Sequence, residues 1–394
     1  MPDQVHVAVA LEGAGWHPAA WRDDAARPRD LVSPAYWRDL LRTADDAGVL
    51  LATIEDALSF TGRFEQEPQP GRARGRLDAV LIASFAGPLT RRIGLVPTVT
   101  TTHTEPFHVA TGTQTLDFAS RGRAGVRLVA GASPAEAANF GRGRTVLSSL
   151  PASGRVEDSP EALAAFREAD EFAEVLERLW DSWQDDAIIR DIESGRFVDA
   201  DRIHPASFEG EFVSVAGASI VPRSPQGRPV VTALAHQTVP FRFAAARADI
   251  VFTTPATADG LGAIRAELDA AGGVPRVFAD LLVLVEDTRA AARDALARLD
   301  DLAGEPLASD ARIVAGTADD IVDEIRALAV AGADGVRLRP ARLPRDLHRI
   351  ADDVVPRLRS AGALADDDGS AVTLRDRLGL PRPADRRVRA EEAA

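Results

Sequence analysis

Residues 93–129 read IGLVPTVTTTHTEPFHVATGTQTLDFASRGRAGVRLV, and this stretch contains a complete strand–helix–strand unit. The apolar run 93–99 predicts a strand, residues 106–120 predict a helix, and 124–129 predict a second strand. The strands are apolar on both faces, which is typical of parallel strands buried under helices. The unit therefore indicates an α/β protein with a parallel sheet.

The same alternation of short β-rich runs and longer helical stretches continues in both directions. Eight strands are predicted, at 5–11, 49–54, 93–99, 124–129, 229–234, 249–252, 276–285 and 335–338. The helices that follow them are predicted at 34–47, 77–89, 106–120, 162–183, 239–248, 256–271, 319–331 and 343–360. Eight βα units in one chain fit a TIM barrel, (β/α)8, better than an open doubly wound sheet.

The length of 394 residues leaves room for insertions, because a minimal barrel needs about 250 residues. Residues 131–160 are rich in Gly, Ser and Pro and predict an insertion after strand four. Residues 185–227 predict a second insertion before strand five, and 287–310 predict an extra helix. The expected organisation is a barrel domain over 1–364 and a C-terminal extension over 365–394, first acidic and then rich in Arg and Pro.

The composition excludes several kinds of chemistry. Cysteine is absent, which excludes disulfides, thiolate nucleophiles, iron–sulfur clusters and Cys-ligated zinc. All 46 basic residues are arginine, so a lysine Schiff base and the lysine of a phosphate-binding P-loop are excluded too. The net charge of −14 argues against nucleic acid or an anionic membrane as a partner. We see no signal peptide and no run of about 18 apolar residues, so a cytoplasmic protein is expected.

Reactive groups of a TIM barrel sit at the C-terminal ends of its strands. The candidates there are residues 12–17 after strand one, Glu55 and Asp56 after strand two, 98–103 after strand three, 130–133 after strand four and His236 after strand five. No G-x-S-x-G elbow and no G-x-G-x-x-G fingerprint occurs. An enzyme with so few nucleophiles of its own would rely on a bound cofactor.

Each candidate has a functional and a structural interpretation. Asp56 could orient a ligand or accept a proton, or it could cap a helix or pair with an arginine. His236 could bind a negative group before a helix, or be a surface histidine. Trp16 could line an apolar pocket, and His103 could bind an anion or donate to a substrate. His103 and His108 are five residues apart with no acidic cluster nearby, so no metal site is predicted.

Nine short motifs occur in order and resemble one known family. They are RRIGL (91–95), TVTTT (98–102), PFHVA (106–110), TLD (115–117), GRAG (122–125), AANFG (137–141), ADEF (169–172), LWDSW (179–183) and QGRPV (226–230). The chain resembles the bacterial luciferase-like flavin-dependent monooxygenases, in the branch that includes nitrilotriacetate and dibenzothiophene-sulfone monooxygenases. The resemblance covers about residues 5–360.

This resemblance implies a TIM barrel that forms a dimer or tetramer. It implies reduced FMN, supplied by a separate flavin reductase, and molecular oxygen acting on a small organic substrate. Some relatives use a deazaflavin for hydride transfer instead. Matching residues to the family places Asp56 near the flavin ring, Thr101 in contact with the flavin and Thr100 close by. Trp16 and His103 are the candidate substrate contacts.

Other positions depart from the family pattern. The usual Trp-Asn motif after strand four is VRLVAG at 126–131 here. The His and Tyr that normally precede the long helix align with Ala162 and Phe166. The Gly-x-Ser phosphate loop after strand five is LAH at 234–236, which leaves His236 or Arg127 to replace it.

The expected function is therefore a two-component, flavin-dependent monooxygenase whose two insertions act as lids over the flavin. The alternatives are a deazaflavin-dependent hydride-transfer enzyme and a non-catalytic homologue that acts as a partner subunit or ligand-binding protein.

Overall fold

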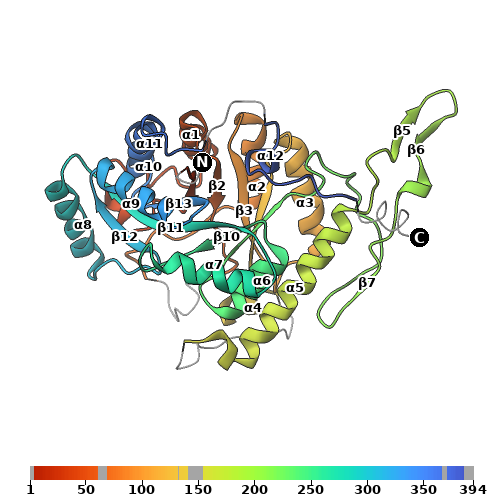
Figure 1. Ribbon diagram of the computed structural model, residues 1–394, viewed down its shortest axis with the longest axis horizontal. Coiled ribbons are helices and arrows are strands. Elements are labelled where there is room, and N and C mark those ends of the chain that lie inside the picture. The colour runs from red at the N-terminus through yellow and green to blue at the C-terminus, as the bar shows by residue number, and fades with distance from the viewer. Residues whose placement is uncertain (1–3, 61–68, 132, 141–153, 366–370, 386–394) are drawn as a thin grey trace.

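The computed structural model describes residues 4–60, 69–131, 133–140, 154–365 and 371–385. Eight parallel strands close into a barrel surrounded by helices (Figure 1). In order around the barrel they are β1 (His6–Leu11), β2 (Leu51–Ile54), β3 (Gly94–Thr100), β4 (Gly125–Val129), β9 (Val230–Leu234), β10 (Ile250–Thr253), β11 (Arg276–Val285) and β13 (Gly335–Pro340), which pairs with β1. The predicted TIM barrel is confirmed.

The outer helices follow the predicted order. They are α1 (Pro34–Ala47), α2 (Ala79–Ala86), α3 (Pro106–Ala119), α5 (Pro160–Trp180), α6 (Thr238–Arg247), α7 (Gly260–Ala270) and α9 (Ala318–Val330). The last helix, predicted as continuous over 343–360, consists instead of α10 (Arg345–Arg349), a π-helical turn (Ile350–Val354) and α11 (Val355–Ser360). Pro356 explains the break, because proline has no N–H to donate to the preceding turn.

A further strand, β12 (Arg312–Gly316), was not predicted. It pairs with residues 281–285 of β11, while β10 pairs with 276–279 of the same strand. The first half of the long strand β11 therefore pairs with β10, and its second half pairs with β12. Most residues of β12 are half-buried or exposed, so it lacks the apolar run by which the other strands were predicted. The extra helix expected within 287–310 is α8 (Arg289–Ala303).

Both insertions depart from the plain barrel. The insertion after strand four contains α4 (Pro134–Phe140). Residues 132 and 141–153 of this insertion lie outside the described residues. The insertion before strand five forms two antiparallel hairpins, β5 (Ile188–Asp191) with β6 (Arg196–Val198) and β7 (Phe208–Glu209) with β8 (Ser214–Val215). The first hairpin projects away from the barrel (Figure 1). No helix within the described ranges has the length and apolar character needed to cross a membrane.

The C-terminal segment closes the N-terminal end of the barrel. Leu374, in α12 (Leu374–Arg377), and Leu378 are buried against inward-facing residues of the strands. Those residues include Ala8, Leu51, Val96, Val230, Ile250, Phe252 and Phe278. Arg375 fastens the segment through two hydrogen bonds to Asp249, at 3.0 and 2.7 Å. The division into a barrel of 1–364 and an extension of 365–394 stays a prediction.

Replacing Leu374 with alanine is expected to lower the free energy of unfolding by about 2–5 kcal/mol, because a fully buried leucine is lost from this plug. Urea unfolding followed by circular dichroism measures the change. Val372→Ala is the matched control, since Val372 is 74% exposed in the same segment. Equal losses for the two variants would show that the segment does not plug the barrel.

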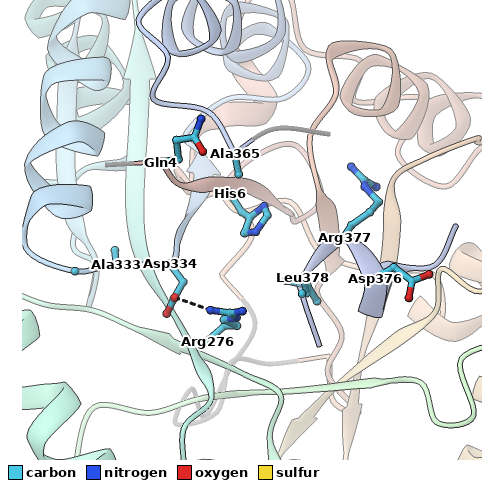
Figure 2. A pocket seen from close by; sticks show the side chains of 11 residues that line it. Gln4, His6, Arg276, Ala333, Asp334, Ala365, Asp376, Arg377 and Leu378 are labelled. Atoms are coloured by element: carbon cyan, nitrogen blue, oxygen red, sulfur yellow. Dashed lines mark hydrogen bonds and ion pairs between the residues drawn. The ribbon is translucent and has the colours of Figure 1, made fainter. Parts of the chain in front are cut away.

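A hollow of about 530 Å³ lies beside this plug, between α12 and the first residues of the strands (Figure 2). His6, Arg276, Asp334 and Arg377 are among its lining residues. Arg276 pairs with Asp334 at 3.3 Å, so part of its charge is neutralised within the protein. Because TIM barrels place their chemistry at the opposite end of the strands, we assign no reaction to this hollow.

Candidate functional site

The C-terminal ends of the eight barrel strands form the mouth of the barrel, and charged side chains fill the space beneath it. Arg127 of β4 forms an ion pair with Glu55, the residue after β2, and its Nε donates to Thr98 Oγ1 at 3.0 Å. Thr98 and Arg127 are register partners on neighbouring strands, so both side chains point inward. The side chains of Arg127 and Glu55 are each only 8% exposed.

A second group of charges continues across the barrel interior from Asp280 of β11. Both Arg337 and Arg339 of β13 form ion pairs with Asp280, and all three side chains are buried. Arg337 also lies 3.7 Å from Glu55, which joins the two groups, and Arg339 pairs with Asp310 at 2.6 Å. Three arginines thus face three carboxylates (Glu55, Asp280 and Asp310). We call these six residues the interior charge cluster.

The interior charge cluster was missed by the sequence analysis apart from Glu55 and Arg127. A signal was present, because Arg337 lies in the strand predicted at 335–338, Arg339 follows it two residues later, and Asp280 interrupts an apolar run. A buried charge needs a partner, and strand alternation turns all three side chains inward. The predicted barrel makes these two strands neighbours, but the sequence alone did not set their register, so it did not place Asp280 opposite Arg337.

Asp56 joins the end of β2 to the start of α2. Its carboxylate accepts hydrogen bonds from the backbone N–H groups of Ala57 at 2.8 Å and Ala79 at 2.9 Å. Burial raises the pKa of Asp56, and these two hydrogen bonds oppose the increase. Asp56 therefore organises the backbone at the mouth, and its contact with a flavin stays a prediction.

The residues after β3 contact the loop after β4. The Thr101 hydroxyl donates to the Val129 carbonyl at 3.3 Å. The side chain of Thr100 packs so closely on Gly131 that a Cβ at Gly131 would overlap its methyl group. His103 is buried, and its ring stacks on Phe140 of α4 at a centroid distance of 5.3 Å. The structure therefore brings His103 together with the first insertion.

Helix α4 is docked over the mouth next to Asp56. Glu136 accepts a hydrogen bond from the Leu58 N–H at 3.1 Å, and Asn139 donates to the Leu58 carbonyl at 2.9 Å. These two contacts join the insertion after β4 to the loop after β2. Such a position suits the predicted role of a lid.

Trp16 and His236 interact with an ion pair of the interior charge cluster, that of Arg339 with Asp310. The Arg339 guanidinium stacks over the Trp16 ring at 4.7 Å, and Trp16 Nε1 donates to the Ala10 carbonyl at 3.2 Å. Burial opposes ionisation of Asp310, but the hydrogen bond and charge of Arg339 lower its pKa, with a further contribution from His236. His236 is exposed at the start of α6. Arg127 is paired inside the barrel, so His236 is the better placed of the two residues considered for phosphate binding.

Glu12 follows β1 and completes the mouth. Its carboxylate lies 3.3 Å from Arg76, and its side chain is 31% exposed. Burial raises the pKa of Glu12, Arg76 opposes the increase, Glu55 and Asp56 add to it, and Arg127 opposes it. Within the described parts of the chain, no three His, Asp or Glu side chains are placed to hold a metal ion.

Comparison with known proteins identifies the family. The family model described as luciferase-like monooxygenase matches residues 15–320. The chain belongs to the luciferase-like monooxygenase family. The resemblance drawn from the sequence motifs is confirmed, and with it the prediction of a monooxygenase of this flavin-dependent family.

Two curated relatives support the predicted branch. Dibenzothiophene-sulfone monooxygenase of Rhodococcus erythropolis is 28% identical, with 92% of this chain and 93% of the relative covered. Nitrilotriacetate monooxygenase component A of Aminobacter aminovorans is 28% identical, with 96% of this chain and 97% of the relative covered.

Solved structures support the fold of this luciferase-like monooxygenase. Long-chain alkane monooxygenase superposes with a TM-score of 0.82 at 22% identity, and 96% of each chain is covered. An F420-dependent secondary alcohol dehydrogenase superposes with a TM-score of 0.61 at 14% identity, over 90% of this chain and 99% of the other. The fold therefore also occurs in an F420-dependent enzyme.

Proposed function

We propose that this luciferase-like monooxygenase binds reduced FMN at the barrel mouth and uses molecular oxygen to oxygenate a small organic substrate. When bound, reduced FMN supplies the two electrons that activate oxygen. Asp56, Thr100 and Thr101 would hold the flavin ring, and Trp16 and His103 would contact the substrate. The protein's own task is to orient both molecules and exclude water, with α4 as part of the cover.

The polar groups at the mouth fit a flavin. The Ser133 hydroxyl, in the loop after β4, is buried and has no hydrogen-bond partner within the described residues. Since buried polar groups are nearly always satisfied, this hydroxyl suits a bound polar ligand. It belongs to the same corner as Thr100 and Thr101, since Thr100 packs on Gly131 and Thr101 bonds to Val129. The observation that carries the proposal is this set of hydroxyls at the strand ends of a family barrel.

The phosphate of FMN would lie against His236 and the first turn of α6. Gln237 precedes this helix, but its side chain bonds to the Gly154 carbonyl and the Val156 N–H instead of capping it. The first amides of α6 therefore receive no side-chain cap and can donate to an anion, as helix N-termini commonly do.

We expect His236→Ala to weaken the binding of reduced FMN about tenfold, which corresponds to one hydrogen bond to a charged group, of about 1.5 kcal/mol. Reduced riboflavin lacks the phosphate, so its affinity should stay unchanged. Anaerobic fluorescence titration of both ligands measures the two effects. An equal loss for FMN and riboflavin would place His236 at the ring instead.

The function itself is tested by supplying reduced FMN from a separate flavin reductase and following oxygen consumption with small sulfur, amine and ketone compounds. Substrate-dependent formation of an oxygenated product supports the proposal. Binding of a reduced deazaflavin but not of FMN would favour hydride transfer. Binding of neither cofactor would favour the non-catalytic homologue.

We also propose that the protein acts in the cytoplasm as a homodimer or homotetramer with a separate flavin reductase. The relative named component A is by that name one part of a larger system, which supports a reductase partner. Light scattering of the purified protein measures the number of subunits. The net charge of −14 supports the absence of a nucleic-acid or membrane partner.

A further inference from the structure

We propose that Glu12 is the proton-carrying carboxyl group of the flavin site, a role that rests on the proposed function. In this role Glu12 takes up a proton when reduced FMN binds and donates it during turnover to the oxygen atom that leaves as water. It takes up the next proton from solvent when another reduced FMN binds.

The backbone holds Glu12 in a fixed place at the mouth. Its carbonyl accepts a hydrogen bond from the Gly15 N–H at 2.7 Å, which closes a tight turn directly after β1. Gly15 has a φ of 124°, and a Cβ there would overlap the Ala341 carbonyl oxygen in the loop after β13. The turn is thus packed against the neighbouring strand end and has little freedom to move.

The other carboxylates of the mouth are each held by two partners or by a buried arginine. Glu55 is ion-paired with Arg127, and Asp310 is paired with Arg339. Asp56 accepts hydrogen bonds from two backbone N–H groups, which a change in its protonation would disturb. Glu12, in contrast, has one described ion pair, the 3.3 Å contact with Arg76, and part of its side chain is open to solvent. It is the carboxylate that can lose and regain a proton without breaking a buried network.

The surroundings of Glu12 raise its pKa above the ordinary value of a glutamate. Partial burial is the largest influence and raises its pKa. Glu55 and Asp56 add to this increase, while Arg76 and Arg127 oppose it. An anionic ligand at the mouth removes water and adds negative charge, and both effects raise the pKa of Glu12 further.

The proton balance closes over one reaction. Substrate, oxygen, anionic reduced FMN and one proton give oxygenated substrate, oxidised FMN and water. One oxygen atom forms a bond to the substrate, the oxygen–oxygen bond breaks, and the second oxygen atom leaves as water. In net terms both electrons and one hydrogen of that water would come with reduced FMN, and the second hydrogen is the proton that Glu12 takes up from solvent when FMN binds. Glu12 is thus ionised before FMN binds, protonated in the complex and ionised again after the transfer.

Proton uptake is measured directly by isothermal titration of reduced FMN, under anaerobic conditions, in two buffers of different ionisation enthalpy. We expect the wild-type protein to take up a substantial fraction of one proton per FMN near neutral pH. Glu12→Gln should retain FMN binding and lose most of this uptake. Glu209→Gln is the matched control, because Glu209 is exposed on β7, and its uptake should equal the wild-type value.

A second variant covers the case in which Glu12→Gln does not fold. Arg76→Gln removes a positive charge beside Glu12, so the pH of maximal uptake should move upward. Uptake that is unchanged in Glu12→Gln, or a pH of maximal uptake that is unchanged in Arg76→Gln, overturns the role of Glu12. Failure of the wild-type protein to bind FMN overturns the proposed function instead, so the two failures are distinguishable.

Discussion

Asp280→Ala is expected to lower the free energy of unfolding by about 3–5 kcal/mol, because breaking a buried ion pair leaves an uncompensated buried charge. Asp280 is the shared partner of Arg337 and Arg339, so its removal weakens the pairing of two buried guanidinium groups at once. Arg337 would retain Glu55 at 3.7 Å, and Arg339 would retain Asp310 at 2.6 Å. Urea unfolding monitored by tryptophan fluorescence measures the loss.

Asp287→Ala provides the control for this experiment. Asp287 pairs with Arg349 at 2.6 Å but is 84% exposed, and exposed ion pairs contribute only about 0–1 kcal/mol. Comparable losses of unfolding free energy in the two variants would contradict the view that burial makes the interior charge cluster important for stability.

The second large effect is expected in the pair of Arg127 and Glu55. Arg127→Leu leaves the Glu55 carboxylate buried with Arg337 as its nearest described cation, and Glu55→Leu leaves Arg127 without its partner. Each single change should cost about 3–5 kcal/mol of unfolding free energy. The double variant should recover most of that loss, because an apolar pair of similar volume replaces two buried charges.

The same variants also test how the charge beneath the barrel mouth affects the binding of reduced FMN. Arg127→Leu adds an uncompensated negative charge beneath the proposed flavin ring, so anionic reduced FMN should bind at least tenfold more weakly than to the wild-type protein. The double variant restores neutrality and should recover the affinity. Anaerobic titration of the three variants measures both effects. Additive stability losses, with no recovery in the double variant, would show that Arg127 and Glu55 are not coupled.

Two of the motifs that pointed to the family, TLD and GRAG, contain residues with a structural role. Asp117, in the TLD motif, accepts hydrogen bonds from the Ala124 N–H at 3.1 Å and from Gln226 Nε2 at 2.6 Å. Arg123, in the GRAG motif, donates to the carbonyls of Ile93 and Gly87 at 2.6 and 2.8 Å. These contacts fasten the N-terminal end of the barrel, opposite the mouth. A family can therefore be recognised from residues that support its framework, even where the expected phosphate loop has changed.

The alternation of apolar runs and helical stretches was sufficient to predict the barrel, because each parallel strand must be followed by a covering helix. It also predicted that Asp56, Thr101 and His103 lie at one end of the sheet, because the C-terminal ends of parallel strands all lie at the same end of a barrel. The strand β12 was not predicted because most of its side chains are only partly buried.

The chemistry at that end of the barrel was decided by tertiary structure. The register of β11 on β13 sets Asp280 opposite Arg337, and there its carboxylate forms ion pairs with both Arg337 and Arg339. The tertiary structure also places the Trp16 ring against the Arg339 guanidinium. The ion pair of Arg339 with Asp310 holds the segment before β12 near the mouth. The physical reason is distance: a repeating pattern along the chain predicts which way a side chain points. Its partner, its charge balance and its readiness to hold a proton depend on residues tens to hundreds of positions away.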